Sequence, residues 1–580
     1  MALRPSGSKP KPSTLSIIFL SLTFLLLITT FRPKPYRNDV GQLQNESPEE
    51  GFHSDIQNPR WYDIVSEDIH SKIIKIGLVN MHGSVHEPRG LTGTVTVDFE
   101  RLAESRRWEE FFPEWIDEGE ISGTPTCPDI PMPRFEDYGE LDVVVARVPC
   151  GTDRTEGEGV RDLFRLQVNL VVANLLVRSS WKKHGVDRKV YVVFIGTCAP
   201  MLEIFRCDDL VWREGDFRVY RPDLSRLKEK VAMPVGTCQL APPIAEAVLQ
   251  LIFIELAVHL LPLIMTISSY LHRNGGQEAW RRNVRFIQNA TLYQPREAYV
   301  SVLHSSEAYV CGAIALAQSI IRTNATKDLV LLADDSISKK SLRGLKAAGW
   351  KVKRIERIRS PHAKQGSYNE WNYSKLRIWQ LVEYDRVIFI DSDLIVLENV
   401  DKFFLYPPLS AVGNDKHLFN SGVMLIEPSH CVFETLMKQR FTLASYNGGD
   451  QGFLNEIFTW WHRWPTKLNR LKMFLNAKEH KHEILENPYM IHYLGLKPWM
   501  CYQDYDCNWD MLDHHLFASD SAHSKWWQAY EAMPKKLRPY CALTKSMDAR
   551  ITKWRGRAKN ASLRDGHWKI KVKDPRRLGL

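Results

Sequence analysis

The chain has 580 residues, of which 44% are hydrophobic and 25% are charged, and its formal net charge is +9. This length exceeds what one ordinary hydrophobic core contains, so we expect two or more globular domains. Two basic stretches, 281–285 and 567–577, lie in no pattern that is typical of nucleic-acid binding, so we expect no nucleic-acid partner.

Residues 13–31 consist of Leu, Ile, Phe, Ser and Thr without a charge, and they are numerous enough to span a bilayer. The run is longer than a typical signal-peptide core, and no small-residue cleavage pattern follows it. We therefore expect an uncleaved transmembrane signal anchor between a short tail, 1–12, and a polar stem, 32–58. Basic residues flank the run on both sides, so the positive-inside rule leaves its orientation open.

Residues 59–240 predict a smaller α/β region. Leu141–Val148 and Val190–Gly196 are typical of strands, and Asp162–Arg178 between them is typical of a helix. We find no catalytic motif in this region, and a structural or acceptor-side role is expected.

A second apolar stretch, 244–270, is interrupted by charged residues, which are costly at membrane depth. A buried or interfacial helix is favoured over a second membrane span. An insertion, or sequence foreign to the mature fold, is a further alternative.

The ten cysteines include no Cys-x-x-Cys pair, so a thiolate zinc site is not expected. In a lumenal chain some of them would form disulfides, and Cys501 and Cys507 are plausible local partners. The sequence leaves the rest of the connectivity open.

From residue 295 onward, short apolar runs alternate with helical patterns. This alternation predicts a mainly parallel sheet with helices on both faces, and such sheets bind ligands at the carboxyl ends of their strands. The segments after Leu303 and after Ile390 fall at such ends. The expected strands are Tyr299–Leu303, Leu329–Ala333 and Arg386–Ile390, and the expected helices are Gly312–Arg322, Lys339–Ala348 and Ser374–Val382.

An Asp-x-Asp triplet, Asp391-Ser392-Asp393, follows the last of these strands. The spacing alone is weak evidence, because Asp504-Tyr505-Asp506 repeats it by chance. Four further segments have suitable chemistry for a shared site. They are Lys375 near a helix start, an expected turn at Asn420-Ser421-Gly422, the Gly-Gly-Asp-Gln segment ending in Asp450 and Gln451, and the segment from His492 to Lys497.

Together these residues predict a site for a metal and a diphosphate. Carboxylates and an imidazole can bind manganese, so Asp391, Asp393 and His492 are the candidate ligands. The ion would neutralise charge on a departing nucleoside diphosphate, and Lys497 would add positive charge there. Asn420, Asp450 and Gln451 would bind sugar hydroxyls.

On these residues, the stretch from about Ala298 to Trp509 resembles glycosyltransferase family 8, the retaining group that contains glycogenin and galacturonosyltransferases. Four segments are similar to the plant members of that family that transfer glucuronic acid to xylan. These are Tyr368–Lys375, Phe458–Arg463, Asp504–Trp509 and Asp565–Lys571.

The resemblance implies a GT-A fold over 295–520 with a C-terminal extension over 521–580. It further implies UDP-glucuronate as donor, xylan as acceptor, α-1,2 branches made with retention of configuration, and manganese as cofactor. It implies a single-pass type II protein of the Golgi membrane, held by residues 13–31, with a cytoplasmic tail and a lumenal catalytic domain. Homo- or hetero-oligomerisation stays open.

Residue by residue, the resemblance implies roles for the positions that match the family's motifs. The metal ligands are Asp391, Asp393 and His492, and the catalytic residues are Lys375, Asp450 and Gln451. The residues implied to contact the UDP-sugar are Leu303, His304, Ser305, Tyr309, Asp391, Ser392, Asp393, Asn420, Ser421, Gly422, Asn447, Asp450, Gln451, His492, Gly495 and Lys497.

The sequence departs from the family in two places. One residue separates Gly495 from Lys497, where glycogenin-like members have two, and 241–282 corresponds to no part of the family. The residue that recognises the donor carboxylate is not identified. The alternatives are galacturonosyl transfer to pectin, glycogenin-like glucosyl transfer, or a non-catalytic scaffold role in a Golgi complex.

Five tryptophans are candidates for stacking on acceptor sugars, although core packing is the expectation for most of them. They are Trp460, Trp461, Trp464, Trp526 and Trp527.

Overall fold

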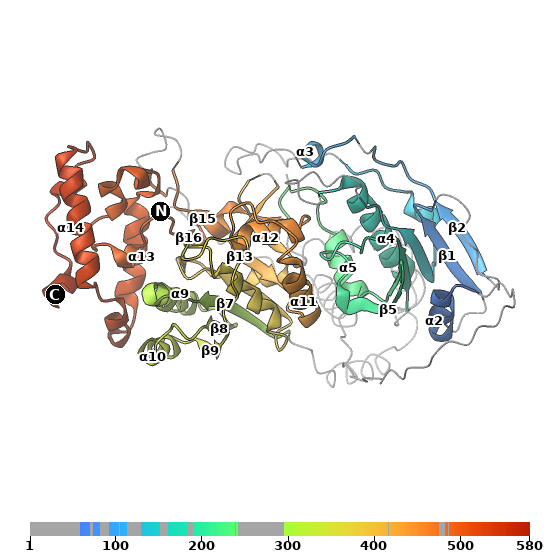
Figure 1. Cartoon of the computed structure of the whole chain (residues 1–580), viewed down its shortest axis with the longest axis horizontal. Helices are drawn as coiled ribbons and strands as arrows, with labels where there is room; N and C mark the ends of the chain where they lie inside the picture. The colour runs from blue at the N-terminus through green and yellow to red at the C-terminus, as the bar shows by residue number, and fades with distance from the viewer. Residues whose placement is uncertain are drawn as a thin grey trace, which may run out of the picture. The chain divides into compact units, whose positions relative to one another are not determined.

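The computed structural model in Figure 1 describes residues 58–69, 73–81, 92–103, 105–112, 129–150, 161–181, 189–237, 239–241, 295–415, 417–474, 482–484 and 487–579. The expected tail, signal anchor (13–31) and apolar stretch (244–270) lie outside these residues, as does the expected stem up to residue 57. Within the described ranges, every helix is too short or too polar to cross a bilayer. The described residues within 59–182, 189–252 and 296–580 form one compact unit.

The N-terminal region contains a six-stranded sheet with the order β2-β1-β3-β4-β6-β5. The four strands β2, β1, β3 and β4 are parallel, and β6 pairs antiparallel with both β4 and β5. The strands expected around 141–148 and 190–196 are β3 and β4. The strand bounds are β1 Ile74–Val79, β2 Thr92–Val97, β3 Val143–Arg147, β4 Tyr191–Ile195, β5 Leu210–Glu214 and β6 Phe217–Tyr220.

Among the described residues, four α-helices accompany this sheet. The helix expected over 162–178 is α4, and its apolar residues are buried in the core of this region. The bounds are α2 Arg60–Asp68, α3 Trp108–Phe111, α4 Leu163–Trp181 and α5 Leu224–Val231.

The second sheet has seven strands in the order β14-β12-β13-β10-β7-β8-β9. The strands β9, β8, β7 and β10 are parallel as expected, whereas β13 runs antiparallel to both of its neighbours, so the sheet is mixed. The bounds are β7 Glu297–Leu303, β8 Asp328–Ala333, β9 Lys351–Arg354, β10 Arg386–Ile390, β12 Ser410–Gly413, β13 Phe419–Ile426 and β14 His462–Trp464.

A small sheet of three strands adjoins the carboxyl end of β10. Its order is β11-β16-β15, and the pair of β11 and β16 is antiparallel. The bounds are β11 Leu394–Val396, β15 Arg470–Leu471 and β16 Met490–His492.

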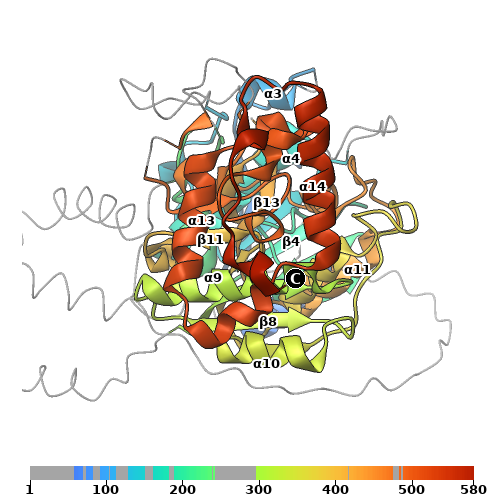
Figure 2. The same ribbon diagram turned by 90° about the vertical axis from the view of Figure 1, so that its left-hand side faces the viewer.

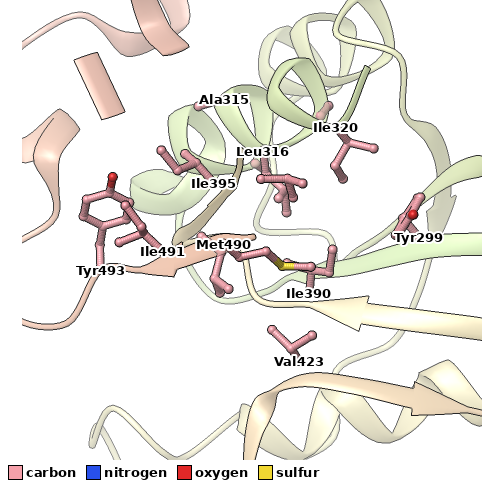
Figure 3. Close-up of a cluster of buried hydrophobic side chains, with 14 of the residues drawn as sticks. Tyr299, Ala315, Leu316, Ile320, Ile390, Ile395, Val423, Met490, Ile491 and Tyr493 are labelled. Carbon is pink, nitrogen blue, oxygen red and sulfur yellow. The ribbon is translucent and has the colours of Figure 1, made fainter. Parts of the chain in front are cut away.

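Helix α9, Val310–Arg322, covers one face of the large sheet at the point where the two sheets meet. Leu316 and Ile320 of this helix belong to the same buried cluster as Ile390 and Met490 (Figure 3). Because α9 is apolar on nearly all sides, it lies in the core rather than at the surface. The other α-helices in the described part of this region are α10 Lys339–Ala347, α11 His430–Gln439, α12 Asp450–Ile457, α13 Asp520–Ala532 and α14 Lys545–Asn560.

Of the two C-terminal helices, α13 packs against α9, whereas α14 contacts the segments Cys507–Asp510 and His567–Lys569. Helix α13 contacts α9 (Figure 2), and the disulfide between Cys311 and Cys541 joins α9 to the segment that follows α13. The local disulfide expected between Cys501 and Cys507 is present.

Polar and covalent links join the N-terminal region to the sheet of seven strands. A disulfide connects Cys207 to Cys431 at the start of α11, and the Arg386 guanidinium pairs with Glu229 of α5. Oε1 of Glu203 accepts hydrogen bonds from the Trp460 amide at 3.1 Å and from the hydroxyl of Thr459 at 3.2 Å. All five tryptophans considered for sugar stacking are buried in cores, which confirms the core-packing expectation.

Candidate functional site

The three predicted metal ligands converge where the two sheets meet. Asp391 and Asp393 lie between β10 and β11, and His492 ends β16. Because Leu394 of β11 is opposite His492 in the antiparallel register, the imidazole comes beside Asp393. Nε2 of His492 is 3.3 Å from Oδ1 of Asp393. One ligand atom from each of the three residues lies within 4.8 Å of the others, and this donor set fits a divalent first-row cation.

Asn469 orients the imidazole. Its Oδ1 is 3.1 Å from Nδ1 of His492, and its Nδ2 donates to Oδ1 of Asn420 at 2.9 Å. With the amide assigned in this way, Nδ1 carries the ring proton and the Nε2 lone pair faces the carboxylates. The sequence analysis missed Asn469, because neither its spacing nor its residue type distinguishes it from a loop asparagine.

Ser392 separates the two carboxylates and is itself buried. Its carbonyl oxygen lies against Gly312 of α9, where an added Cβ would be 2.3 Å from that oxygen. Glycine at this position therefore allows α9 to approach the metal-binding turn.

Lys497 approaches the same carboxylates despite the short spacing after Gly495. Its Nζ is 2.7 Å from Oδ2 of Asp393 and donates to the carbonyl oxygen of Tyr493 at 2.5 Å. Burial alone would raise the pKa of Asp393, but Lys497 and His492 hold that pKa below its usual range. Burial would lower the pKa of Lys497, but Asp393 raises it. Lys497 is therefore a permanent cation beside the triad.

Lys375 connects the triad to α12. Its Nζ is 2.6 Å from Oδ2 of Asp450 and 3.4 Å from Oδ1 of Asp391. Burial opposes its charge, but Asp391 and Asp450 raise the pKa of this lysine. Burial, together with the charge of Asp393, raises the pKa of Asp391 to about 6. The two carboxylates of the triplet therefore differ in how easily they ionise.

The segment Asn420-Ser421-Gly422, expected as a turn, is instead the start of β13, and the turn prediction was wrong. Strand pairing with β10 and β12 overrides the local turn preference of these residues. The Asp391 amide donates to the Gly422 carbonyl at 2.9 Å, so β13 fixes the metal-binding turn. A Cβ on Gly422 would be 2.6 Å from Cε1 of His492.

Gln451 and Asn447 have different roles around the start of α12. Oε1 of Gln451 accepts from the Ser421 amide at 3.2 Å, and its Nε2 donates to the Tyr446 hydroxyl at 2.7 Å. Oδ1 of Asn447 accepts from the amides of Gly449 at 2.9 Å and Gly452 at 3.3 Å. Asn447 therefore stabilises the loop that leads into α12. Gln451 contacts Ser421, which is also predicted to bind the donor.

Four of the residues implied to contact the UDP-sugar, Leu303, His304, Ser305 and Tyr309, lie at the end of β7 or after it. The Leu303 side chain is buried in the core at 2% exposure, so only its backbone is available. The Ser305 amide donates to Oδ2 of Asp334 at 3.1 Å, and Oγ of Ser305 is 3.0 Å from Nδ1 of His304. Burial lowers the pKa of His304 to about 4, so this imidazole is neutral at pH 7. Tyr309 is half-buried, and its ring centroid is 5.9 Å from Nζ of Lys497.

Asp334 was missed by the sequence analysis. It directly follows β8, so the rule that pointed to the segments after Leu303 and Ile390 would also have selected it.

The second Asp-x-Asp triplet has a structural role. Oδ2 of Asp506 accepts from Nζ of Lys472 at 2.6 Å, with both side chains buried. Asp504 accepts the backbone amides of Lys573 at 2.8 Å and Asp574 at 3.0 Å. This supports the distinction between the two triplets, because among the described residues the first triplet forms a metal-ligand group with an imidazole and the second does not.

Two family descriptions match the chain. "GUX1-5 N-terminal domain" matches residues 52–238, and "Glycosyl transferase family 8" matches residues 301–502, which contain the triad. UDP-glucuronate:xylan alpha-glucuronosyltransferase 2 of Arabidopsis thaliana is 47% identical over 87% of this chain and 80% of its own length. Another protein of that plant, provisionally named UDP-glucuronate:xylan alpha-glucuronosyltransferase 4, is 46% identical over 100% of both chains.

The match to family 8 covers all the site residues and the sheet of seven strands except the first four residues of β7, which accords with a GT-A-like fold of mixed sheets and helices. Full-length similarity at this identity extends the relationship to the N-terminal region. The chain therefore belongs to glycosyltransferase family 8, within the family of UDP-glucuronate:xylan alpha-glucuronosyltransferases.

Proposed function

We propose that this glycosyltransferase moves glucuronic acid from UDP-glucuronate to a xylose hydroxyl of the xylan backbone, forming α-1,2 branches with retention of configuration. The observation that carries the proposal is the triad of Asp391, Asp393 and His492 with Lys497 beside it, in a chain 47% identical to an enzyme named for this reaction. A scaffold protein would not need a metal-ligand triad with a neighbouring cation, which argues against that alternative.

Manganese is the cofactor we propose. Asp391, Asp393 and His492 would hold it, and the ion supplies neutralising charge for the departing UDP. Lys497 adds a fixed positive charge on the side of Asp393. Lys375 holds Asp450 in place through their 2.6 Å contact. Among the described residues, no carboxylate is positioned as an evident nucleophile. We therefore favour a front-face mechanism, in which UDP leaves and the acceptor hydroxyl attacks on the same face of the donor sugar.

We further propose that the protein is a single-pass type II protein of the Golgi membrane, held by residues 13–31, with its catalytic domain in the lumen. The uncharged run of nineteen residues supports the membrane segment. The four disulfides found among the described residues, Cys150–Cys198 being one, support folding in an oxidising compartment.

The donor is tested by incubating the protein with manganese, xylohexaose and each of several UDP-sugars, followed by mass spectrometry. We expect a mass increase of one glucuronosyl residue with UDP-glucuronate alone. Transfer only from UDP-glucose or UDP-galacturonate would overturn the proposed donor and favour one of the other family 8 activities.

The metal site is tested by the double variant Asp391→Asn with Asp393→Asn. We expect transfer to fall more than about 100-fold, because the carboxylates are replaced by poor ligands of nearly equal shape. Chelation of the wild type should cause the same loss, and added manganese should restore it. Asp504→Asn, in the structural triplet, is the matched control and should retain activity. Full activity in the double variant would disprove the site assignment.

A further inference from the structure

A chain of hydrogen bonds and ion pairs leads from the metal triad to the surface. Asp391 contacts Lys375, which pairs with Asp450. Oδ2 of Asp450 accepts from the Ser421 hydroxyl at 2.8 Å, and the Ser421 amide donates to Gln451 at 3.2 Å. Every member of this chain is buried or half-buried.

The chain ends on an exposed tyrosine. The Tyr446 hydroxyl accepts a hydrogen bond of 2.7 Å from Nε2 of Gln451, while 56% of this residue is exposed to solvent. Burial is the main cause that raises the pKa of its hydroxyl, and the nearby carboxylate of Asp450 adds to this effect. The hydrogen bond from Gln451 thus holds the hydroxyl end of Tyr446, while more than half of the residue is accessible to solvent.

The backbone below Tyr446 is rigidly held. Nδ2 of Asn369 donates to the Asn447 carbonyl at 2.7 Å, and the Ser360 hydroxyl donates to the Gly448 carbonyl at 2.8 Å. Gly448 has a φ of +70°, and a Cβ there would be 3.2 Å from the carbonyl oxygen of His362. The exposed ring is therefore displayed on a fixed loop, which lowers the entropic cost of binding a ligand to it.

We infer that Tyr446 is an acceptor-binding residue, on which a xylose ring of the xylan backbone stacks, and that its hydroxyl positions Gln451. The inference rests on the proposed function for its choice of acceptor. The diphosphate end of the donor belongs at the triad, so the acceptor must approach the sugar from the solvent side. Tyr446 is an exposed aromatic residue that joins the site there through Gln451, and the C–H face of a pyranose packs well on an aromatic ring.

The chain offers a matched control on the same connection between α11 and α12. Phe441 is 64% exposed and contacts the Arg440 guanidinium, with 4.5 Å between Cζ and the ring centroid. It is an exposed aromatic residue of similar size, and its ring contacts Arg440 rather than a residue of the hydrogen-bonded chain from the triad.

The test measures the steady-state kinetics of Tyr446→Ala, Tyr446→Phe and Phe441→Ala. In one series xylohexaose is varied at saturating UDP-glucuronate, and in the other UDP-glucuronate is varied at saturating xylohexaose. We expect Tyr446→Ala to raise the KM for xylohexaose about tenfold and to leave the KM for UDP-glucuronate within about twofold. Tyr446→Phe should restore the acceptor KM but lower kcat about fivefold, because Gln451 loses its hydrogen-bond acceptor. Phe441→Ala should behave as the wild type.

An unchanged acceptor KM in Tyr446→Ala, or equal increases of both KM values, would overturn the inference while leaving the proposed function intact. Failure of the proposed function shows instead in the wild type. A wild-type protein that neither binds nor glucuronidates xylohexaose overturns that function, and with it the acceptor assigned to Tyr446.

Discussion

At the scale of single residues, the site depends on close backbone contacts that admit no side chain. Gly422 lies against the imidazole of His492. A Cβ added to Gly422 would be 2.6 Å from Cε1 of His492 and 2.8 Å from Oδ1 of Asn420. Since a real Cβ does not approach other atoms so closely, either the strand or the imidazole must move.

For Gly422→Ala we therefore expect loss of manganese binding and of transfer activity, with a free energy of unfolding lower by about 1–3 kcal/mol. Isothermal titration with manganese and chemical denaturation measure the two effects. Gly556→Ala is the control, because Gly556 is an exposed residue of α14 with no atom within 4 Å of an added Cβ. That variant should be as stable as the wild type or more so by about 0.5–1 kcal/mol.

Asn469 allows a subtler test of the same centre. Asn469→Ala removes the group that fixes the ring of His492 but keeps all three metal ligands. We expect the Kd for manganese to rise about 10–100-fold, as is usual when the orienting partner of a metal-bound histidine is lost. An unchanged Kd by titration would show that the imidazole is held well enough by β16 itself.

At the scale of elements, strand order and pairing decide what the sequence could predict. The strands β7, β8 and β10 and the helices α9 and α10 were predictable, because their apolar runs are long and alternate regularly. The ligands Asp391 and Asp393 were predictable from the end of β10. The antiparallel course of β13 was not, because its polar Asn420-Ser421-Gly422 start has the local preferences of a turn. The acceptor-side role that we infer for Tyr446 was also not predictable, because neither residue type nor spacing indicates its hydrogen bond to Gln451.

The stacked rings near α13 make stability depend on pH. His567 lies between Asp520, at 2.8 Å, and Asp565, at 2.9 Å, and stacks on Trp509 with centroids 4.8 Å apart. Burial opposes the charge of this imidazole, but hydrogen bonds to the two carboxylates raise its pKa above the usual 6.5. A raised pKa in the folded state stabilises the fold below pH 6.5, and this stabilisation is lost as the pH rises through the folded-state value.

We therefore expect His567→Gln to lower the denaturation midpoint clearly at pH 6 and much less at pH 9. Thermal denaturation at several pH values measures this difference. A loss of the same size at every pH would show that His567 contributes through ring packing rather than through its charge.

At the scale of the whole molecule, the N-terminal region and the sheet of seven strands are bound into one unit. The disulfide between Cys207 and Cys431 spans 224 residues of sequence, whereas that between Cys501 and Cys507 spans 6. In the chain-entropy account, the longer loop restricts the unfolded chain more.

We expect replacement of Cys207 and Cys431 by serine to lower the free energy of unfolding by about 2–4 kcal/mol, and the same replacement of Cys501 and Cys507 to lower it less. The KM for UDP-glucuronate should not change in the first variant, because neither Cys207 nor Cys431 belongs to the site. Urea denaturation followed by fluorescence compares the two variants. Equal losses would mean that local packing, and not loop length, sets the contribution of each disulfide.

The pairing of β11 with β16 has a consequence for biosynthesis. A ribosome releases Asp391 and Asp393 roughly a hundred residues before His492, which at about 5–20 residues per second is an interval of about 5–20 s. During that interval the nascent chain carries two carboxylates without their imidazole. Metal loading is therefore a late event, and a transcript that stops before β16 would encode a protein with the family's acidic triplet but no metal centre.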